Sequence, residues 1–107
     1  MPMNDLVALA CRITSGVFSS ELVFEIQLAD GTVHQGVASR RYFFTKEGKA
    51  IAPHEPAGDQ EVDGLVLAQV LRKQGDNILV SIPDGEVVTV DEDLISPCVE
   101  DPGRVFV

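Results

Sequence analysis

The chain has 107 residues, of which 45% are hydrophobic and 23% charged, and it carries a net charge of −9. This length and composition predict one folded globular domain and exclude an intrinsically disordered chain. No apolar stretch approaches the roughly 18 residues of a membrane-spanning helix, and no positively charged leader precedes the first apolar run. We therefore expect a cytoplasmic protein that has no contact with a membrane.

The negative charge lies almost entirely in the second half of the chain. Residues 1–53 contain five acidic and five basic side chains, whereas residues 54–107 contain twelve acidic and three basic ones. An acidic protein is repelled by phosphate backbones, so the charge disfavours nucleic acid as a partner. Two interpretations stay open: the acidity keeps a small domain soluble, or the acidic half docks on a basic partner.

Apolar and polar residues alternate over six segments, and this period of two predicts six β-strands. Asp30-Gly31 separates two of these segments and Asp84-Gly85 separates two others, which predicts type I′ hairpins with positive φ angles at both turn residues. Gly36 predicts a bend or bulge in the third strand. The expected strands are residues 7–14, 22–29, 32–39, 64–73, 77–82 and 86–91.

The stretches between the strands show no sustained helical period, so we expect little helix. Residues 40–45 are expected either to continue the third strand or to turn, and residues 91–95 to form a single helical or 3-10 turn. Residues 45–63 are rich in glycine, proline and charge, which predicts a long loop. This loop is too short to separate two domains, so residues 1–107 are expected to form a single domain.

The two halves of the chain resemble each other weakly, because each has an Asp-Gly turn followed two residues later by a valine. Leu9-Ala10 also corresponds to Leu67-Ala68. Two repeated three-strand units would close into a six-stranded barrel in which each unit buries the face that the other exposes. The alternative is that two unrelated β-meanders share turn residues. In either case the expected fold class is a small antiparallel all-β barrel.

Residues 65–95, LVLAQVLRKQGDNILVSIPDGEVVTVDEDLI, resemble the strand and turn order of SH3-like small barrels, a group that includes Tudor, KOW and Sm-like domains. A strand reaches a glycine-containing turn, a second strand ends in Pro-Asp-Gly, and a third ends in a short turn. The resemblance implies an SH3-like barrel that binds peptides, other proteins or RNA. It implies no cage for methylated ligands, because such a cage needs clustered aromatic side chains and this segment has none.

The sequence contains no local motif for a metal, a cofactor or a catalytic group. Residues 59–64 match the start of a calcium loop, but the twelfth position, which needs a bidentate Glu, is Val70. The two histidines, His34 and His54, and the two cysteines lie too far apart for a zinc motif. No nucleophile elbow or phosphate loop occurs either. We therefore expect a protein that is not an enzyme and that holds no cofactor.

The same histidines and cysteines have ordinary structural interpretations. Cys11 and Cys98 would pair as a disulfide or stay free, and two buried free thiols are the expectation for a cytosolic protein. His34 is expected to be a partly exposed strand residue on the face opposite Val33.

Residues 40–49, the basic–aromatic segment, hold four of the eight bases and three of the six aromatic residues. Such interleaving is typical of surfaces that stack on single-stranded RNA. Strand alternation favours another interpretation, in which Phe43 or Phe44 fills the barrel and the bases balance the acidic half. We expect a non-catalytic binding or assembly module for a protein partner or a second copy of the chain, with an RNA-binding barrel as the alternative. The candidate binding surface consists of Arg40, Arg41, Tyr42, Lys46, Lys49, His54, Asp91 and Asp93.

Overall fold

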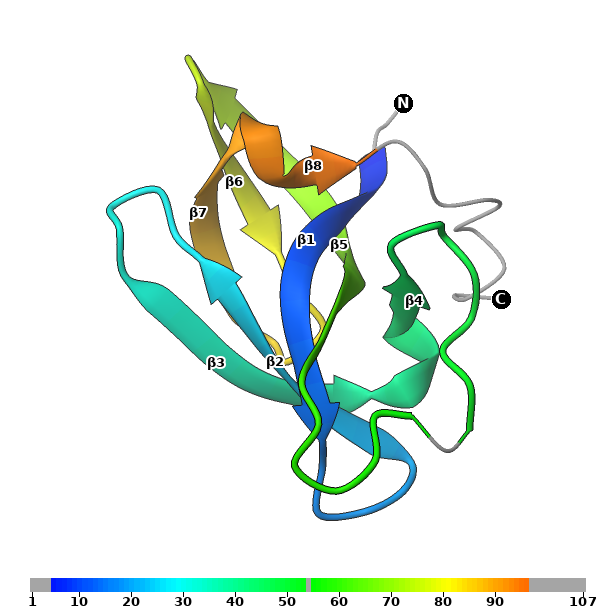
Figure 1. Cartoon of the computed structure of the whole chain (residues 1–107). Helices are drawn as coiled ribbons and strands as arrows, with labels where there is room; N and C mark the ends of the chain where they lie inside the picture. Colours follow the sequence, from blue (N-terminus) through cyan, green and yellow to red (C-terminus); the bar gives the residue numbers. More distant parts are fainter. Residues whose placement is uncertain (1–4, 54, 97–107) are drawn as a thin grey trace.

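The computed structural model describes residues 5–53 and 55–96. Within these ranges the chain forms eight β-strands, two 3-10 turns and no α-helix, which confirms the expected all-β class (Figure 1). The turns η1 (Arg40–Tyr42) and η2 (Glu92–Leu94) precede β4 and β8. The strands are β1 (Asp5–Ser15), β2 (Glu21–Gln27), β3 (Val33–Ser39), β4 (Phe43–Thr45), β5 (Val62–Gln74), β6 (Asn77–Ser81), β7 (Val87–Asp91) and β8 (Ile95–Ser96).

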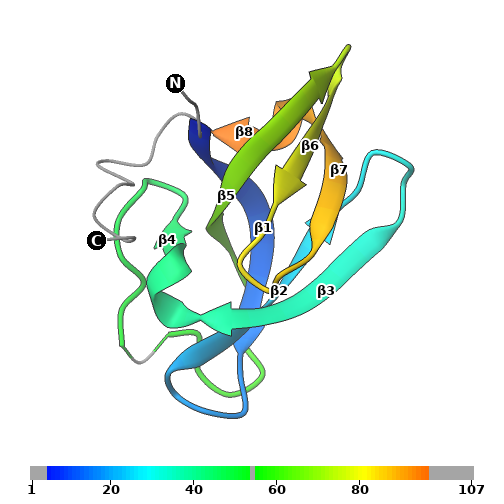
Figure 2. The ribbon, with the colours of Figure 1, turned by 180° about the vertical axis from the view of Figure 1, so that it is seen from behind.

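The strands form one antiparallel sheet in the order β3-β2-β1-β5-β6-β7. This sheet curls through 294° into a half-barrel, which Figures 1 and 2 show from the front and from behind. Outside this path, β4 pairs with β5 and β8 pairs with β1. Strands β3 and β7 are therefore the two ends of the curled sheet.

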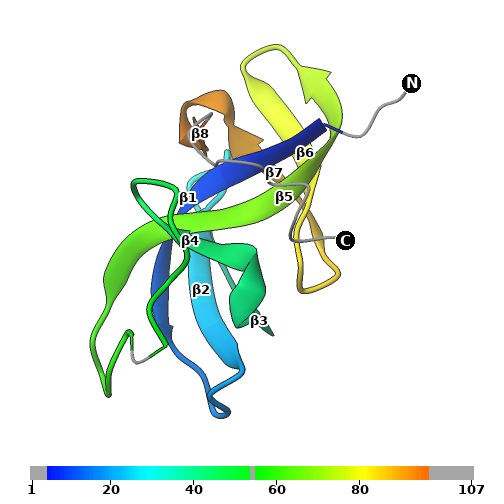
Figure 3. The ribbon, with the colours of Figure 1, turned by 90° about the vertical axis from the view of Figure 1, so that its right-hand side faces the viewer.

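The two halves of the chain have the same order of elements. Each half consists of a three-stranded meander, a 3-10 turn and one short strand, and each short strand pairs with the first strand of the other half. Figure 3 shows the two first strands, β1 and β5, running side by side. The predicted turn near residue 91 is confirmed as η2. Sequence alternation missed β4 and β8 because strands of three and two residues are too short to show a period.

The interior of the half-barrel is filled by every second side chain of the long strands, as the alternation predicted. Ile13 of β1 and both Phe24 and Ile26 of β2 are fully buried, and Phe43 of β4 packs against them. The ring centroids of Phe24 and Phe43 are 5.5 Å apart in a tilted arrangement. Burying each side chain of this size contributes about 1.5–3 kcal/mol to folding.

A second, smaller apolar cluster lies on the opposite face of the sheet. Because consecutive strand residues point to opposite faces, Phe44 points away from the interior that Phe43 fills. Phe44 covers Ala8, Leu65 and Leu67, which are the outward residues of β1 and β5. The short strand β4 therefore contributes one phenylalanine to the apolar cluster on each face of the sheet.

The two Asp-Gly hairpins differ in turn type from the expected type I′. In the first, the Gly31 N–H donates to the Leu28 carbonyl at 3.0 Å, and the Leu28 N–H donates to the Thr32 carbonyl at 2.8 Å. This is a three-residue turn in which only the glycine has to adopt a positive φ, here 91°. The carboxylate of Asp30 accepts from the Thr32 N–H at 2.9 Å and stabilises the turn. The second hairpin repeats this pattern with Ile82, Asp84, Gly85 and Glu86.

The expected bulge at Gly36 is not present, because β2 and β3 pair in regular register over all seven residues of β3. The glycine is needed for a different reason. A Cβ atom at this position would meet the carboxylate of Asp84 and would lie 2.9 Å from Cζ of Phe24. The irregularity of the sheet lies instead between Val70 and Arg72, where the pairing of β5 with β6 shifts.

Replacing Gly36 with alanine should therefore displace the Asp84 carboxylate and the Phe24 ring. We expect Gly36→Ala to lower the free energy of unfolding by about 2 kcal/mol or more, measured by urea denaturation at low protein concentration. Gln35→Ala is the matched control, since Gln35 is exposed on the opposite face, and it should change stability by less than about 0.5 kcal/mol. Equal effects of the two variants would contradict the assigned role of the glycine.

Candidate functional site

The aromatic residues of the basic–aromatic segment are part of the core. Phe43 is 1% exposed and Phe44 is 9% exposed, on opposite faces of the sheet. Neither ring is available for stacking on a ligand. Of the aromatic residues in this segment, only Tyr42 of η1 is half-buried, and it packs against both apolar clusters.

The guanidinium of Arg40 binds backbone carbonyls of its own chain. Its Nε donates to the Ser19 carbonyl at 2.9 Å, and its Nη1 donates to the carbonyls of Ala52 at 3.2 Å and Glu55 at 2.7 Å. These bonds tie the turn between β1 and β2 to the long loop between β4 and β5. Arg40 was predicted as a binding residue, and the structure places its side chain as an anchor of this loop.

The other basic candidates of the segment point to the surface. Arg41 lies over the Tyr42 ring, 5.2 Å from its centroid, and donates to the tyrosine hydroxyl at 3.2 Å. Nζ of Lys46 lies 3.7 Å from a carboxylate oxygen of Asp63, and both side chains are more than half exposed. Lys49 is exposed in the tight turn that follows β4.

The acidic candidates lie on another part of the half-barrel. The Asp91 carboxylate accepts from the Asp93 N–H at 3.0 Å and caps η2. Both acids line a hollow of about 250 Å³ together with Gly31 from the first hairpin. Figure 1 shows the orange turn η2, which follows Asp91, apart from the green turn η1 before β4, which holds Arg40 and Arg41. The described basic and acidic candidates therefore do not come together as one surface, and His54 lies outside the described residues.

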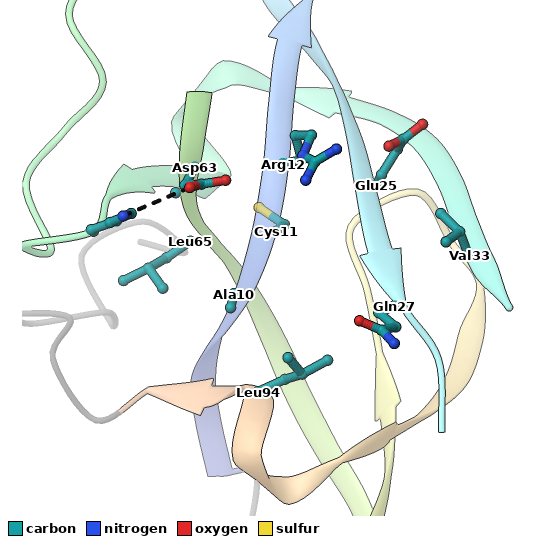
Figure 4. Close-up of a pocket in the computed structure, with 11 residues that line it drawn as sticks. Ala10, Cys11, Arg12, Glu25, Gln27, Val33, Asp63, Leu65 and Leu94 are labelled. Atoms are coloured by element: carbon teal, nitrogen blue, oxygen red, sulfur yellow. Dashed lines mark ion pairs between the residues drawn. The ribbon is translucent and has the colours of Figure 1, made fainter. Parts of the chain in front are cut away.

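A groove of about 500 Å³ opens on the outer face where β1 changes its neighbour (Figure 4). Strand β1 pairs with β8 through Leu9 and with β2 from Arg12 onward. Between these two partners, β1 passes through Ala10 and Cys11, and the groove lies over this stretch. The other lining residues are Glu25, Gln27, Val33, Lys46, Asp63, Gly64, Leu65 and Leu94.

The charges at the rim of this groove are balanced. Figure 4 shows Arg12 between Asp63 on one side and Glu25 on the other. Arg12 also lies 3.4 Å from Glu61, and Asp63 pairs with Lys46. Exposed ion pairs of this kind each contribute about 0–1 kcal/mol to the free energy of unfolding, so they add little to the stability of the fold. The described residues hold no cluster of three or more histidine, cysteine or acidic side chains that would bind a metal ion.

The outer edge of β3 is a second candidate surface. The β3 side chains on the outer face of the sheet are Val33, Gln35 and Val37. Val33 is 59% exposed and Val37 is 45% exposed. No strand in the described part of the chain pairs with this edge. The edge of β7 is different, because the Thr89 carbonyl accepts from the Ala29 N–H at 2.9 Å.

A side-chain pair joins the two ends of the sheet near these edges. Nε2 of His34 on β3 lies 2.7 Å from Oδ2 of Asp84 in the turn between β6 and β7. The two side chains are only 20% and 11% exposed. Alternation correctly placed His34 opposite Val33 and partly exposed, but its partner is 50 residues away and no sequence signal points to it. The hollows described above are lined by neither His34 nor Asp84.

Cys11 of β1 is a free, buried thiol, and Cys98 lies outside the described residues. Burial, and to a smaller extent the negative charge of Asp63, raise the pKa of the Cys11 thiol from 9.0 to about 12. The thiolate is the reactive form of cysteine, so this site is unsuited to nucleophilic chemistry at neutral pH.

Comparison of the chain with models of known protein families, with curated proteins and with solved structures finds no match. The described residues contain no helix of the length and apolarity that a membrane span requires.

Removing the Arg40 side chain should detach the long loop from the turn between β1 and β2. We expect Arg40→Ala to lower the free energy of unfolding by about 1–3 kcal/mol and to accelerate amide hydrogen exchange in residues 46–61. Arg41→Ala is the matched control because the exposed Arg41 side chain lies over the neighbouring Tyr42 and is not bonded to the loop carbonyls that hold Arg40, and it should leave both quantities nearly unchanged. Loop exchange that is the same in both variants would contradict the anchoring role.

The raised pKa of Cys11 should make stability depend on alkaline pH. Since the folded thiol keeps its proton up to about pH 12 and the unfolded thiol loses it near pH 9, the stabilisation is complete below pH 9 and is lost as the pH rises toward 12. We expect the difference in unfolding free energy between the native protein and Cys11→Ala to shrink by about 1–3 kcal/mol between pH 8 and pH 11. A constant difference over this range would refute the burial effect.

Proposed function

We propose that this half-barrel is an SH3-like, non-catalytic module of the cytoplasm that binds an extended segment of a protein partner along the free edge of β3. The observation that carries the proposal is the uncharged, seven-residue outer edge of β3 in a chain with a net charge of −9. Exposed strand edges usually carry lysine, proline or a bulge that blocks pairing with another strand. Strand β3 has none of these.

The backbone of β3 offers the groups that a partner strand needs. Hydrogen bonds in an antiparallel ladder alternate, so every second residue of β3 bonds to β2 and the others direct their N–H and C=O to the free edge. The bonded pairs at the two ends are Leu28 with Thr32 and Ser20 with Arg40. By this alternation, Val33, Gln35, Val37 and Ser39 direct their backbone groups to the free edge. A segment that adds to β3 would use these groups and gain affinity from the main chain.

The groove beside β3 would supply side-chain selectivity. Val33 lines the groove and also belongs to the free edge. Alternate side chains of a segment bound to β3 would point to the same face as Val33 and reach toward Gln27 and Glu25 of β2. The free thiol of Cys11 supports a reducing compartment such as the cytoplasm.

An RNA-binding barrel is the second candidate function. The observation that favours it is the exposed guanidinium of Arg41 over the Tyr42 ring, an arrangement that can stack on a base. Two features weigh against it: Arg40 is bonded to carbonyls of its own chain, and the net charge repels phosphate.

Selection of peptides about twelve residues long from a random display library tests the proposed edge interaction. We expect the native protein to enrich peptides with alternating apolar residues. Val37→Lys should weaken the binding of a selected peptide at least about tenfold in a titration, because the lysine interrupts the apolar edge. Val87→Lys is the matched control, since Val87 is similarly exposed on β7, and it should bind as the native protein does.

Two results would overturn the edge proposal: no enriched peptide, or equal binding by Val37→Lys and the native protein. Titration with single-stranded RNA separates the second candidate. Affinity for RNA that falls with salt and is lost in Arg41→Ala would favour RNA binding instead.

A further inference from the structure

We infer that the segment that adds to β3 is β3 of a second copy of this chain, paired antiparallel about a two-fold axis at Gln35. The inference rests on the proposed function, because it uses the same free edge. It also names the partner and the register, which the proposed function leaves open.

The alternation of hydrogen bonds permits this register. The backbone groups of β3 that point to the free edge belong to Val33, Gln35, Val37 and Ser39, as the bonded pairs at both ends of the strand require. The first three of these residues face one another when two copies pair about Gln35. With the axis at Gln35, Val33 lies opposite Val37 of the second copy, and Gln35 lies opposite itself. Each of these pairs has its bonding groups directed at the other strand, which gives about six hydrogen bonds between the two copies.

The side chains of β3 are complementary to themselves in this register. On the outer face, the exposed Val33 meets the exposed Val37 of the second copy, and the neutral Gln35 side chains meet at the axis. On the inner face, His34 lies opposite Gly36 of the second copy, beside the Asp84 carboxylate that already covers this glycine in each chain. The Asp84 carboxylate contacts His34 from the inner face, so pairing along the edge does not require this contact to open.

Charge favours a second copy in antiparallel orientation. The chain just before β3 holds Asp30, close to the hollow that Asp91 and Asp93 line, whereas the residues just after β3 are Arg40 and Arg41. In the Gln35-centred register, Asp30 lies level with Arg40 of the second copy at both ends of the interface. A parallel pairing would bring acids to acids and bases to bases. The two-fold antiparallel pairing is the arrangement that opposes unlike charges.

The edge of β7 is a poorer place for self-pairing. The Thr89 carbonyl is already bonded to the Ala29 N–H, and β7 ends at the charged Asp91. Among the described residues, no such backbone bond reaches the edge of β3, and its seven residues include no acidic, lysine or arginine side chain.

Molar mass measured by light scattering or sedimentation over a dilution series tests the inference. We expect the native protein to shift from 11.5 kDa toward twice that value as its concentration rises through the micromolar range. Because Asp30 and Arg41 at the two ends are exposed, the dissociation constant should rise several-fold between roughly 50 mM and 500 mM salt. Gln35→Lys and Gln35→Glu should each remain monomeric, because each places like charges face to face at the axis.

The decisive measurement is an equimolar mixture of Gln35→Lys and Gln35→Glu, in which unlike charges meet and the dimer should return. Circular dichroism confirms that each variant is folded, and Val87→Lys serves as the control that still dimerises. A native protein that is monomeric at every concentration overturns the self-pairing while the peptide selection above still tests the edge itself. A dimer that persists in Gln35→Lys, or a mixture that stays monomeric, overturns the β3 interface and its register.

Discussion

The pairing of β1 with β5 is the constraint on which the rest of the structure depends. Nine consecutive residue pairs, from Asp5 opposite Val70 to Ile13 opposite Val62, join the two halves of the chain. The inner faces of these strands supply the centre of the core, and their edges receive β4 and β8. An isolated three-stranded meander would leave its apolar face in water, so each half needs the other to fold.

In the described part of the chain, polar contacts bridge the two ends of the half-barrel where a closed barrel would have a continuous ladder of strand hydrogen bonds. The Ala29 N–H bonds to the Thr89 carbonyl, and His34 contacts Asp84 across the opening between β3 and β7. A fully closed barrel has no free edges, whereas this incomplete closure leaves the outer edge of β3 without a partner among the described strands. The interaction proposed for the protein follows from this unfinished closure more than from any concave site.

The candidate binding residues were predicted from local composition, and composition does not show what a side chain meets. Arg40 was expected at an interface because it lies beside other bases and aromatic residues, yet three carbonyls from distant turns take its hydrogen bonds. Asp91 was expected on a binding surface and caps its own 3-10 turn. Local composition does not single out β3, because its relevant feature is the absence of acidic, lysine and arginine side chains. That absence matters only once the sheet order shows which strands are edges.

By itself, the sequence determined the six longer strands, their inward and outward faces, and the places where the chain reverses. These features depend on alternation and on turn residues such as Asp30 and Gly31, which act over a few neighbouring residues. Only the tertiary structure decided the meeting of His34 with Asp84, the need for a glycine at position 36 and the groove at Ala10. Each of these depends on strands from different halves of the chain. Their relative position is set by the packing of the whole core, and no local pattern records it.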